Sequence, residues 1–332
     1  GGLFTKNISF DGGMPIAGAG DSLTLTGNPV DFTTVTYDFD NESDGSIDVD
    51  GVTIDYFKLE PITASISVMN VILNYSANAE IITASDIGGG QTLIDSAVAG
   101  ESLTFNNPTS TLTINAGDTG VNTIDIGGLA TSYPASILIN GGDGGDTVNL
   151  NGAISFASDR SLTVDAETIN APNATSDITT SGTGGVSLTA AQNIVMSSGS
   201  SITTVNGGIT LGANSAGTTA GNFAGISASG AILQSTGSGN ISLTGQGAVN
   251  GNADADQRGV FLQSSTMVTS AGTGTITFDG TGGDGTSSND GIYVLNSTVQ
   301  SASGNIDLTG VGGAGVSVGN RGVFVEDSSV GS

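Results

Sequence analysis

The chain contains no cysteine, no histidine and no tryptophan, and only 5 of its 332 residues are lysine or arginine. The lack of cysteine excludes disulfides, thiol catalysis and cysteine-based metal sites. The lack of histidine excludes a Ser-His-Asp triad and removes the usual zinc ligand. No segment approaches the run of about 20 apolar residues that a membrane-spanning helix needs. We therefore expect no direct membrane insertion of this segment.

Basic residues are few, while acidic residues number 31, which gives a formal net charge of -26. Nucleic acid is excluded as a partner, because binding to phosphates depends on lysine and arginine. The same charge disfavours anionic membrane surfaces and favours bound cations, which would relieve self-repulsion. The apolar fraction of 36% is low for a compact globule. It is sufficient for a repeat protein in which each coil buries only a thin stripe.

A short apolar–polar–apolar triplet recurs down most of the chain. Alternation with a period of two places the outer residues of each triplet toward a core and the middle residue toward solvent. Short strands repeated in this way predict a stacked solenoid. The triplets occupy residues 112–114, 137–139, 162–164, 186–188, 209–211, 241–243, 276–278 and 306–308.

Later repeats show further strands within each coil, for example at 260–263, 267–269 and 275–278. The sequence therefore predicts an all-β protein. Residues 101–332 are expected to form a right-handed parallel β-helix with three strands per coil and coils of about 23–35 residues. Glycine-rich insertions follow the triplet strand at one corner, either as a binding face or as neutral variation in surface loops. They span residues 212–222, 245–257, 280–290 and 310–320.

Two stretches carry a family resemblance. Residues 184–190 with 192–194, and 201–204 with 206–211, resemble the β-helices of filamentous-haemagglutinin-type proteins, which are very large exported bacterial surface proteins. The resemblance covers roughly residues 110–332. It implies a location outside the cell or at the surface of a bacterium. It also implies contacts with copies of itself or with other surface or matrix proteins, and glycans as further candidate partners.

The first hundred residues lack the regular triplet but still predict strands at 22–26, 33–38, 52–56, 65–75 and 80–84. Glycine and Asn/Asp turns separate these strands. Two interpretations are open, a separate β domain over 1–100 or an irregular beginning of the solenoid, and we favour the adjoining domain. The chain begins at Gly1 and ends within a repeat, which predicts a segment of a longer protein.

The first candidate metal site follows the pattern D-x-[DE]-x-D-G-x-x-D, which resembles the start of a calcium-binding loop. Oxygen ligands at alternate positions wrap a calcium ion, and Gly45 permits the sharp turn. Gly51 stands where such a loop carries a bidentate glutamate, with Asp50 as a weaker substitute. The alternative is a solvated acidic turn. The candidate ligands are Asp40, Glu42, Asp44 and Asp48.

The second candidate is the segment 141–149, GGDGGDTVN, which resembles the nonapeptide of calcium-binding β-rolls. Such a site needs a second copy one coil away, and residues 115–120 offer a degenerate one. Asp143 is then expected to stack near Asp118, and two stacked carboxylates either share a cation or repel each other. The candidate ligands are Asp118, Asp143 and Asp146. The alternative is a glycine-rich corner without an ion.

Two columns of side chains recur in the late coils. Arg258, Asp290 and Arg321 share one repeat position and predict a charge-compensated ladder that fixes the register of the coils. A substrate-binding arginine pair is the functional alternative. A second column consists of Phe261, Tyr293 and Phe324, and we expect it to face outward as a stack that docks sugars or a neighbouring chain. Cover by adjacent loops is the alternative.

These observations favour a non-enzymatic, exported structural or adhesive β-solenoid, stabilised by calcium, as a segment of a cell-surface or extracellular filament. The alternative is a carbohydrate-binding or polysaccharide-degrading β-helix. Such hydrolases need clustered carboxylates, and the sequence places no such cluster on one face. An ice-binding surface is a third class. It is disfavoured because Leu138, Ser187, Ser242 and Asp307 interrupt the outward threonine column.

Overall fold

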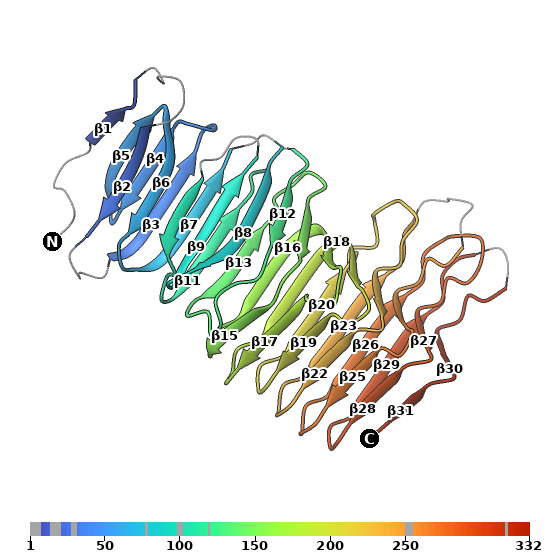
Figure 1. The fold of residues 1–332 in the computed structure, drawn as a ribbon. Helices are drawn as coiled ribbons and strands as arrows, with labels where there is room; N and C mark the ends of the chain where they lie inside the picture. The colour runs from blue at the N-terminus through green and yellow to red at the C-terminus, as the bar shows by residue number, and fades with distance from the viewer. Residues whose placement is uncertain are drawn as a thin grey trace. The chain divides into compact units, whose positions relative to one another are not determined.

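A computed structural model describes residues 8–13, 21–27, 32–76, 79–97, 102–118, 120–249, 255–315 and 318–332. These residues form strands β1 to β31 and no helix (Figure 1). Accordingly, no described segment is a helix that is long and apolar enough to cross a membrane. The prediction of an all-β protein is confirmed.

The chain divides into two compact units. The first is Gly1–Val148 with Ile154–Ala157, and the second is Asn149–Ala153 with Ser158–Ser332. The first unit contains strands on both sides of the predicted boundary at residue 100. Each unit is described separately below.

The second unit contains three parallel ladders of strands (Figure 1). Two long strands, β16 (Leu162–Ala171) and β18 (Val186–Met196), begin both the first and the second ladder, because each has two paired halves. The first ladder continues through β20 (Ile209–Ala213), β23 (Ile241–Gln246), β26 (Ile276–Thr281) and β29 (Ile306–Val311). The second continues through β21 (Ile226–Ser229), β24 (Val260–Gln263), β27 (Ile292–Leu295) and β30 (Val323–Glu326).

The third ladder lies between the second ladder of one repeat and the first ladder of the next along the chain. Its strands are β17 (Asp177–Ser181), β19 (Ser201–Thr204), β22 (Ile232–Ser235), β25 (Met267–Ser270), β28 (Thr298–Ser301) and β31 (Ser329–Gly331). The expected three strands at 260–263, 267–269 and 275–278 correspond to β24, β25 and β26.

Like side chains stack in these ladders. Ile209, Ile241 and Ile276 pair in register along the first ladder, and all three are fully buried. Burial of one such side chain contributes roughly 1.5–3 kcal/mol. In this unit, the outer residues of the recurring triplets therefore form the inward face of the first ladder.

The first unit combines parallel ladders with antiparallel hairpins. One parallel ladder consists of β3 (Phe32–Phe39), β7 (Val68–Tyr75), β11 (Thr111–Asn115) and β13 (Ser136–Asn140). A second consists of β2 (Asp21–Thr26), β6 (Leu59–Ser65) and β10 (Leu103–Asn106). Shorter pairings join β1 (Ile8–Asp11) to β5 (Val52–Phe57) and β8 (Ile81–Gly88) to β12 (Thr123–Ile126).

Hairpins interrupt the repeat in this unit. β4 (Gly45–Val49) pairs antiparallel with both β3 and β5, and β9 (Gln91–Ser96) pairs antiparallel with both β8 and β10. The remaining strands are β14 (Thr147–Leu150) and β15 (Ile154–Ser158). The strands expected at the start of the chain are present. The particular later strands with which they pair in parallel were not predicted, because the hairpins change the spacing between equivalent residues.

Candidate functional site

The corner that follows the first ladder of the second unit contains the asparagine, aspartate and arginine side chains described below. In register along this ladder, Ala190 and Ala213 are followed by Gly245, Gly280 and Gly310. A Cβ atom on Gly280 would overlap the carbonyl oxygen of Gly291, on the returning limb of the same loop. In the same way, a Cβ atom on Gly245 would overlap the carbonyl oxygen of Gly259, and one on Gly310 would overlap that of Gly322. Glycine is therefore required because the two limbs of each late loop are in backbone contact.

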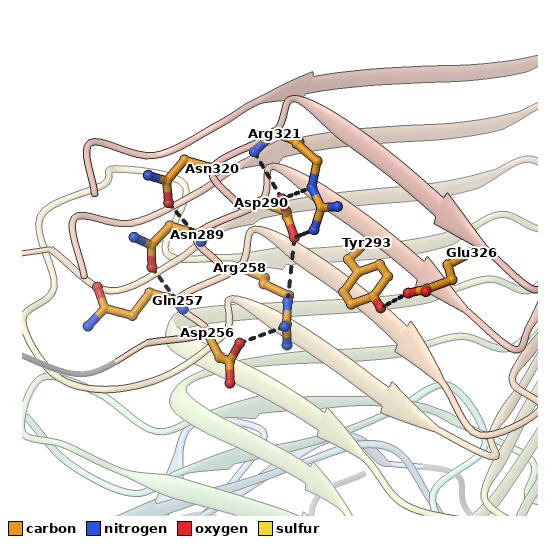
Figure 2. A network of polar contacts seen from close by, with 9 residues as sticks. All are labelled: Asp256, Gln257, Arg258, Asn289, Asp290, Tyr293, Asn320, Arg321 and Glu326. Carbon is orange, nitrogen blue, oxygen red and sulfur yellow. Dashed lines mark hydrogen bonds and ion pairs between the residues drawn. The ribbon is translucent and has the colours of Figure 1, made fainter. Parts of the chain in front are cut away.

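Asparagine side chains close these loops. They also join neighbouring loops to one another (Figure 2). The Asn289 amide nitrogen donates to the Gly285 carbonyl at 2.8 Å, and that of Asn320 donates to the Gly315 carbonyl at 3.0 Å. The Asn289 amide oxygen accepts from the backbone N–H of Gln257 at 3.2 Å, and that of Asn320 accepts from the N–H of Asn289 at 3.1 Å. One amide thus holds its own loop and the preceding coil.

The predicted charge ladder lies beside these amides. Asp290 is fully buried and accepts from the Arg321 Nε at 2.9 Å, the Arg321 Nη2 at 3.2 Å and the Arg321 backbone N–H at 2.9 Å. Arg258 lies on its other side, with Nε 3.9 Å from the Asp290 Oδ2, and also contacts Asp256 at 2.6 Å. The structure therefore brings the three predicted residues together (Figure 2). The hydrogen bond to Asp290 raises the pKa of Arg321.

The predicted aromatic column lies against the same arginines. Phe261 stacks on Tyr293 with ring centroids 5.3 Å apart, and Tyr293 stacks on Phe324 at 4.9 Å. The Arg258 guanidinium lies 4.2 Å from the Phe261 ring centroid, and that of Arg321 lies 3.3 Å from the Phe324 centroid. Such cation–π contacts are attractive because the ring face is electron-rich. The two columns predicted separately from sequence thus form a single cluster.

The cluster is compensated in charge and largely covered. Tyr293 is only 8% exposed, and its hydroxyl donates to Glu326 at 2.5 Å. Burial, followed by this hydrogen bond, raises the pKa of Tyr293. The Arg258 side chain is 11% exposed, whereas that of Arg321 is 43% exposed. The surface accessible to a partner is therefore concentrated at Arg321 and the half-buried Phe324.

The first candidate calcium loop forms the hairpin turn between β3 and β4. The Asp44 carboxylate accepts from the Asn41 amide at 3.0 Å and from the Lys58 backbone N–H at 2.8 Å. These bonds, that of Asn41 first, lower the pKa of Asp44. Asp48 accepts from the Gly51 backbone N–H at 2.9 Å. Asp40 and Glu42 are exposed.

Replacement Asp44→Ala should lower the free energy of unfolding of the first unit by about 1 kcal/mol. The reason is that the substitution removes the carboxylate that accepts hydrogen bonds from the Asn41 amide and the Lys58 backbone N–H. Because the pKa of Asp44 is lowered by folding, its contribution is present above the unfolded-state pKa of about 3.9 and disappears as pH falls through the folded-state pKa. Urea titration followed by tyrosine fluorescence at pH 7 and at pH 2 measures both effects.

Asp40→Ala is the matched control. The backbone N–H of Asp40 donates to the Asp44 carbonyl, a bond that alanine keeps, and the Asp40 side chain is exposed. This variant should change stability by less than about 0.5 kcal/mol without calcium. Equal losses for the two variants would contradict the structural role of Asp44.

At the second candidate, the glycine corners stack as expected. A Cβ atom on Gly142 would overlap the carbonyl oxygen of Gly117 and come within 3.2 Å of the Asp118 Cα. Asp118 and Asp143 are exposed, whereas Asp146 is fully buried and accepts from the Asn122 backbone N–H at 2.6 Å. Asp146 therefore ties one coil to the next.

Calcium binding stays a prediction for both segments. Within the described ranges, no group of three or more acidic side chains lies close enough together to hold a metal ion. Among the predicted ligands, Asp118 and Asp143 at the glycine corner have exposed carboxylates on neighbouring turns.

An amide ladder in the first unit was missed from the sequence. The Asn74 amide donates to Asp38, the Asn115 amide donates to Asn74, and the Asn140 amide donates to Asn115, each at 2.7 Å. The available signal was an asparagine directly after an aliphatic strand residue in Leu73-Asn74, Ile114-Asn115 and Ile139-Asn140. Only the parallel register of β3, β7, β11 and β13 makes these residues neighbours.

Comparisons with family models, with curated proteins and with solved structures found no match for this chain. The resemblance to filamentous-haemagglutinin-type β-helices therefore stays a prediction from the sequence. The contacts described above are the basis for a functional proposal.

Proposed function

We propose that this chain is a structural or adhesive segment of an exported surface or extracellular filament protein, folded as a right-handed parallel β-helix with three strands per coil. The observation that carries the proposal is the use of polar side chains at the coil corners. Asn289, Asp290 and Asn320 all bind the backbone or side chains of adjacent coils. Side chains used in this way hold repeats in register.

Stiffness is the mechanical consequence of this arrangement. Each coil contacts only its neighbours, so stability is a sum over coils and over the interfaces between them. The buried aliphatic stacks supply the favourable term, and the Asn, Asp and Arg ladders oppose sliding of one coil on the next. A rod of this kind suits contacts with copies of itself or with other surface or matrix proteins, outside a bacterial cell.

Calcium is the cation that we propose for the exposed acidic corner. Asp118 and Asp143 follow glycines that lie in contact on successive turns, and carboxylate oxygens are the ligands that calcium prefers. A bound cation would also relieve part of the net charge of -26. We expect calcium to raise the thermal midpoint of unfolding, and Asp143→Asn to remove that increase. Calorimetry with calcium, with magnesium and with chelator tests this, and an unchanged midpoint in calcium would contradict it.

Electron microscopy of the native material, with and without a calcium chelator, tests the proposed role. A structural role predicts long regular fibres, and loss of the fibres on chelation would assign calcium to assembly. Dispersed particles in both conditions would contradict the filament role.

A glycan-binding module is the second candidate, and the partly exposed Arg321 above Phe324 favours it. Aromatic faces and guanidinium groups are common contacts of sugars and their carboxylates. A glycan array with the wild-type chain and with Phe324→Ala distinguishes the two roles, because only the module predicts specific binding that the substitution abolishes.

A further inference from the structure

The turn between the second and third ladders presents an asparagine within an Asn-Ser-Thr sequence. Asn296 joins β27 to β28 and adopts a left-handed backbone conformation with φ of 44°. Its backbone N–H donates to the Glu326 carbonyl at 3.1 Å, and its carbonyl accepts from the Ser265 N–H at 2.7 Å. The backbone is thus fixed between two coils, while the side chain is exposed.

Four other described asparagines occupy the pattern Asn-x-Ser/Thr, and all have their amides engaged. Asn74 lies within the amide ladder, and the Asn41 oxygen accepts from the backbone N–H groups of Ser43 and Asp44. The Asn173 oxygen accepts from the Thr175 N–H at 2.8 Å, and the Asn240 oxygen accepts from the Thr275 N–H at 2.9 Å. These bonds fix the amides of the four residues.

Asn296 differs from all four. Within the described parts of the chain, its side-chain amide has no hydrogen-bond partner. It also borders a surface hollow that Thr298, Asp327 and Ser329 line from the same and the adjacent coil. A substituent on the amide nitrogen would therefore break no observed contact and would lie along a polar, hydroxyl-rich surface.

We propose that Asn296 is an acceptor of N-linked sugar, with Thr298 as the hydroxyl residue of the recognition sequence. The donor is a glycosyl diphosphate, either nucleotide-linked or lipid-linked, used by a separate transferase. A bond forms between the Asn296 Nδ2 and the anomeric carbon, and the bond from that carbon to the diphosphate oxygen breaks. The diphosphate departs and one amide proton is lost, so no oxidant or reductant is needed. The inference does not depend on filament formation.

Peptide mapping by mass spectrometry of the protein from its natural source tests the proposal. We expect a sugar mass on the peptide that contains Asn296 and none on those that contain Asn41, Asn74, Asn173 or Asn240. A single hexose would indicate a nucleotide-linked donor, and a larger oligosaccharide would indicate a lipid-linked one. An unmodified Asn296, or sugar on any of the other four in its place, would overturn the proposal.

Substitution provides the matched control. In the same host, Asn296→Gln should abolish the glycosylated species, whereas Asn240→Gln should leave its abundance unchanged. Both variants keep a neutral amide, and a circular dichroism spectrum of Asn296→Gln that matches the wild type would show that it folds. Retention of the modified species in the Asn296→Gln protein would contradict the assignment.

Discussion

Asp290→Ala should lower the free energy of unfolding of the second unit by about 3 kcal/mol, at the lower end of values for removing one partner of a buried ion pair. Asp290 is fully buried and accepts three hydrogen bonds from Arg321, while Arg258 approaches its other side. Its removal leaves two guanidinium groups facing each other across the space of one carboxylate. We expect a loss at the lower end of this range because the Arg321 guanidinium is partly exposed, so water can solvate it once Asp290 is removed.

Urea unfolding followed by circular dichroism, with hydrogen exchange over residues 276–326, measures this effect and its location. Asp256→Asn is the matched control, because Asp256 contacts the same Arg258 but its side chain is 58% exposed, and asparagine tolerates the φ of 71° at this position. Because water solvates the Asp256 carboxylate, the loss of this ion pair should lower the free energy of unfolding by about 1 kcal/mol or less. Equal effects of the two substitutions would show that the ladder does not hold the coils in register.

Gly280→Ala is expected to destabilise the second unit by about 3 kcal/mol, because overpacking against the backbone forces the two limbs of a loop apart. The added Cβ would overlap the Gly291 carbonyl oxygen and lie 2.7 Å from a side-chain carbon of Ile292. Neither the carbonyl nor the core residue can move without breaking ladder pairing. Increased hydrogen exchange should be confined to the loops and to strands β26 and β27.

Gly212→Ala is the control for this substitution. Gly212 lies in β20 without a positive φ, and an added Cβ meets no atom within 4 Å. The change should leave stability unaltered or raise it by up to about 1 kcal/mol, because alanine restricts the unfolded chain. A loss at Gly212 as large as that at Gly280 would contradict the close approach of the two loop limbs.

The strand pattern of the second unit was predictable because it is local. Alternation in a segment such as 276–278 marks an inward face wherever it occurs, and the recurrence of the same pattern marks equivalent positions in successive coils even where the coils differ in length. The same logic placed Arg258, Asp290 and Arg321 in one column and the three rings in a second column. Repeat position alone is sufficient to identify neighbours when coils differ only by a loop at one corner.

Other features depend on contacts that spacing does not reveal. The guanidinium of Arg258 covers the ring of Phe261, a side-chain direction that repeat position does not specify. The Asp38, Asn74 and Asn115 ladder was missed because hairpins separate its members by unequal intervals. Asp146 was predicted as a ligand from its motif, whereas the fold directs it to the Asn122 backbone.

Pulsed electron paramagnetic resonance on the second unit tests the stacking of coils most directly. The chain has no cysteine, so Thr163→Cys and Thr277→Cys in one protein provide two unique labelling sites. Residues 163, 187, 210, 242 and 277 are successive partners in the first ladder, so four steps of about 4.8 Å place the two backbones about 19 Å apart. The account predicts a narrow distance distribution near this value, widened only by the label arms. A broad distribution centred well beyond it would contradict the in-register parallel stack.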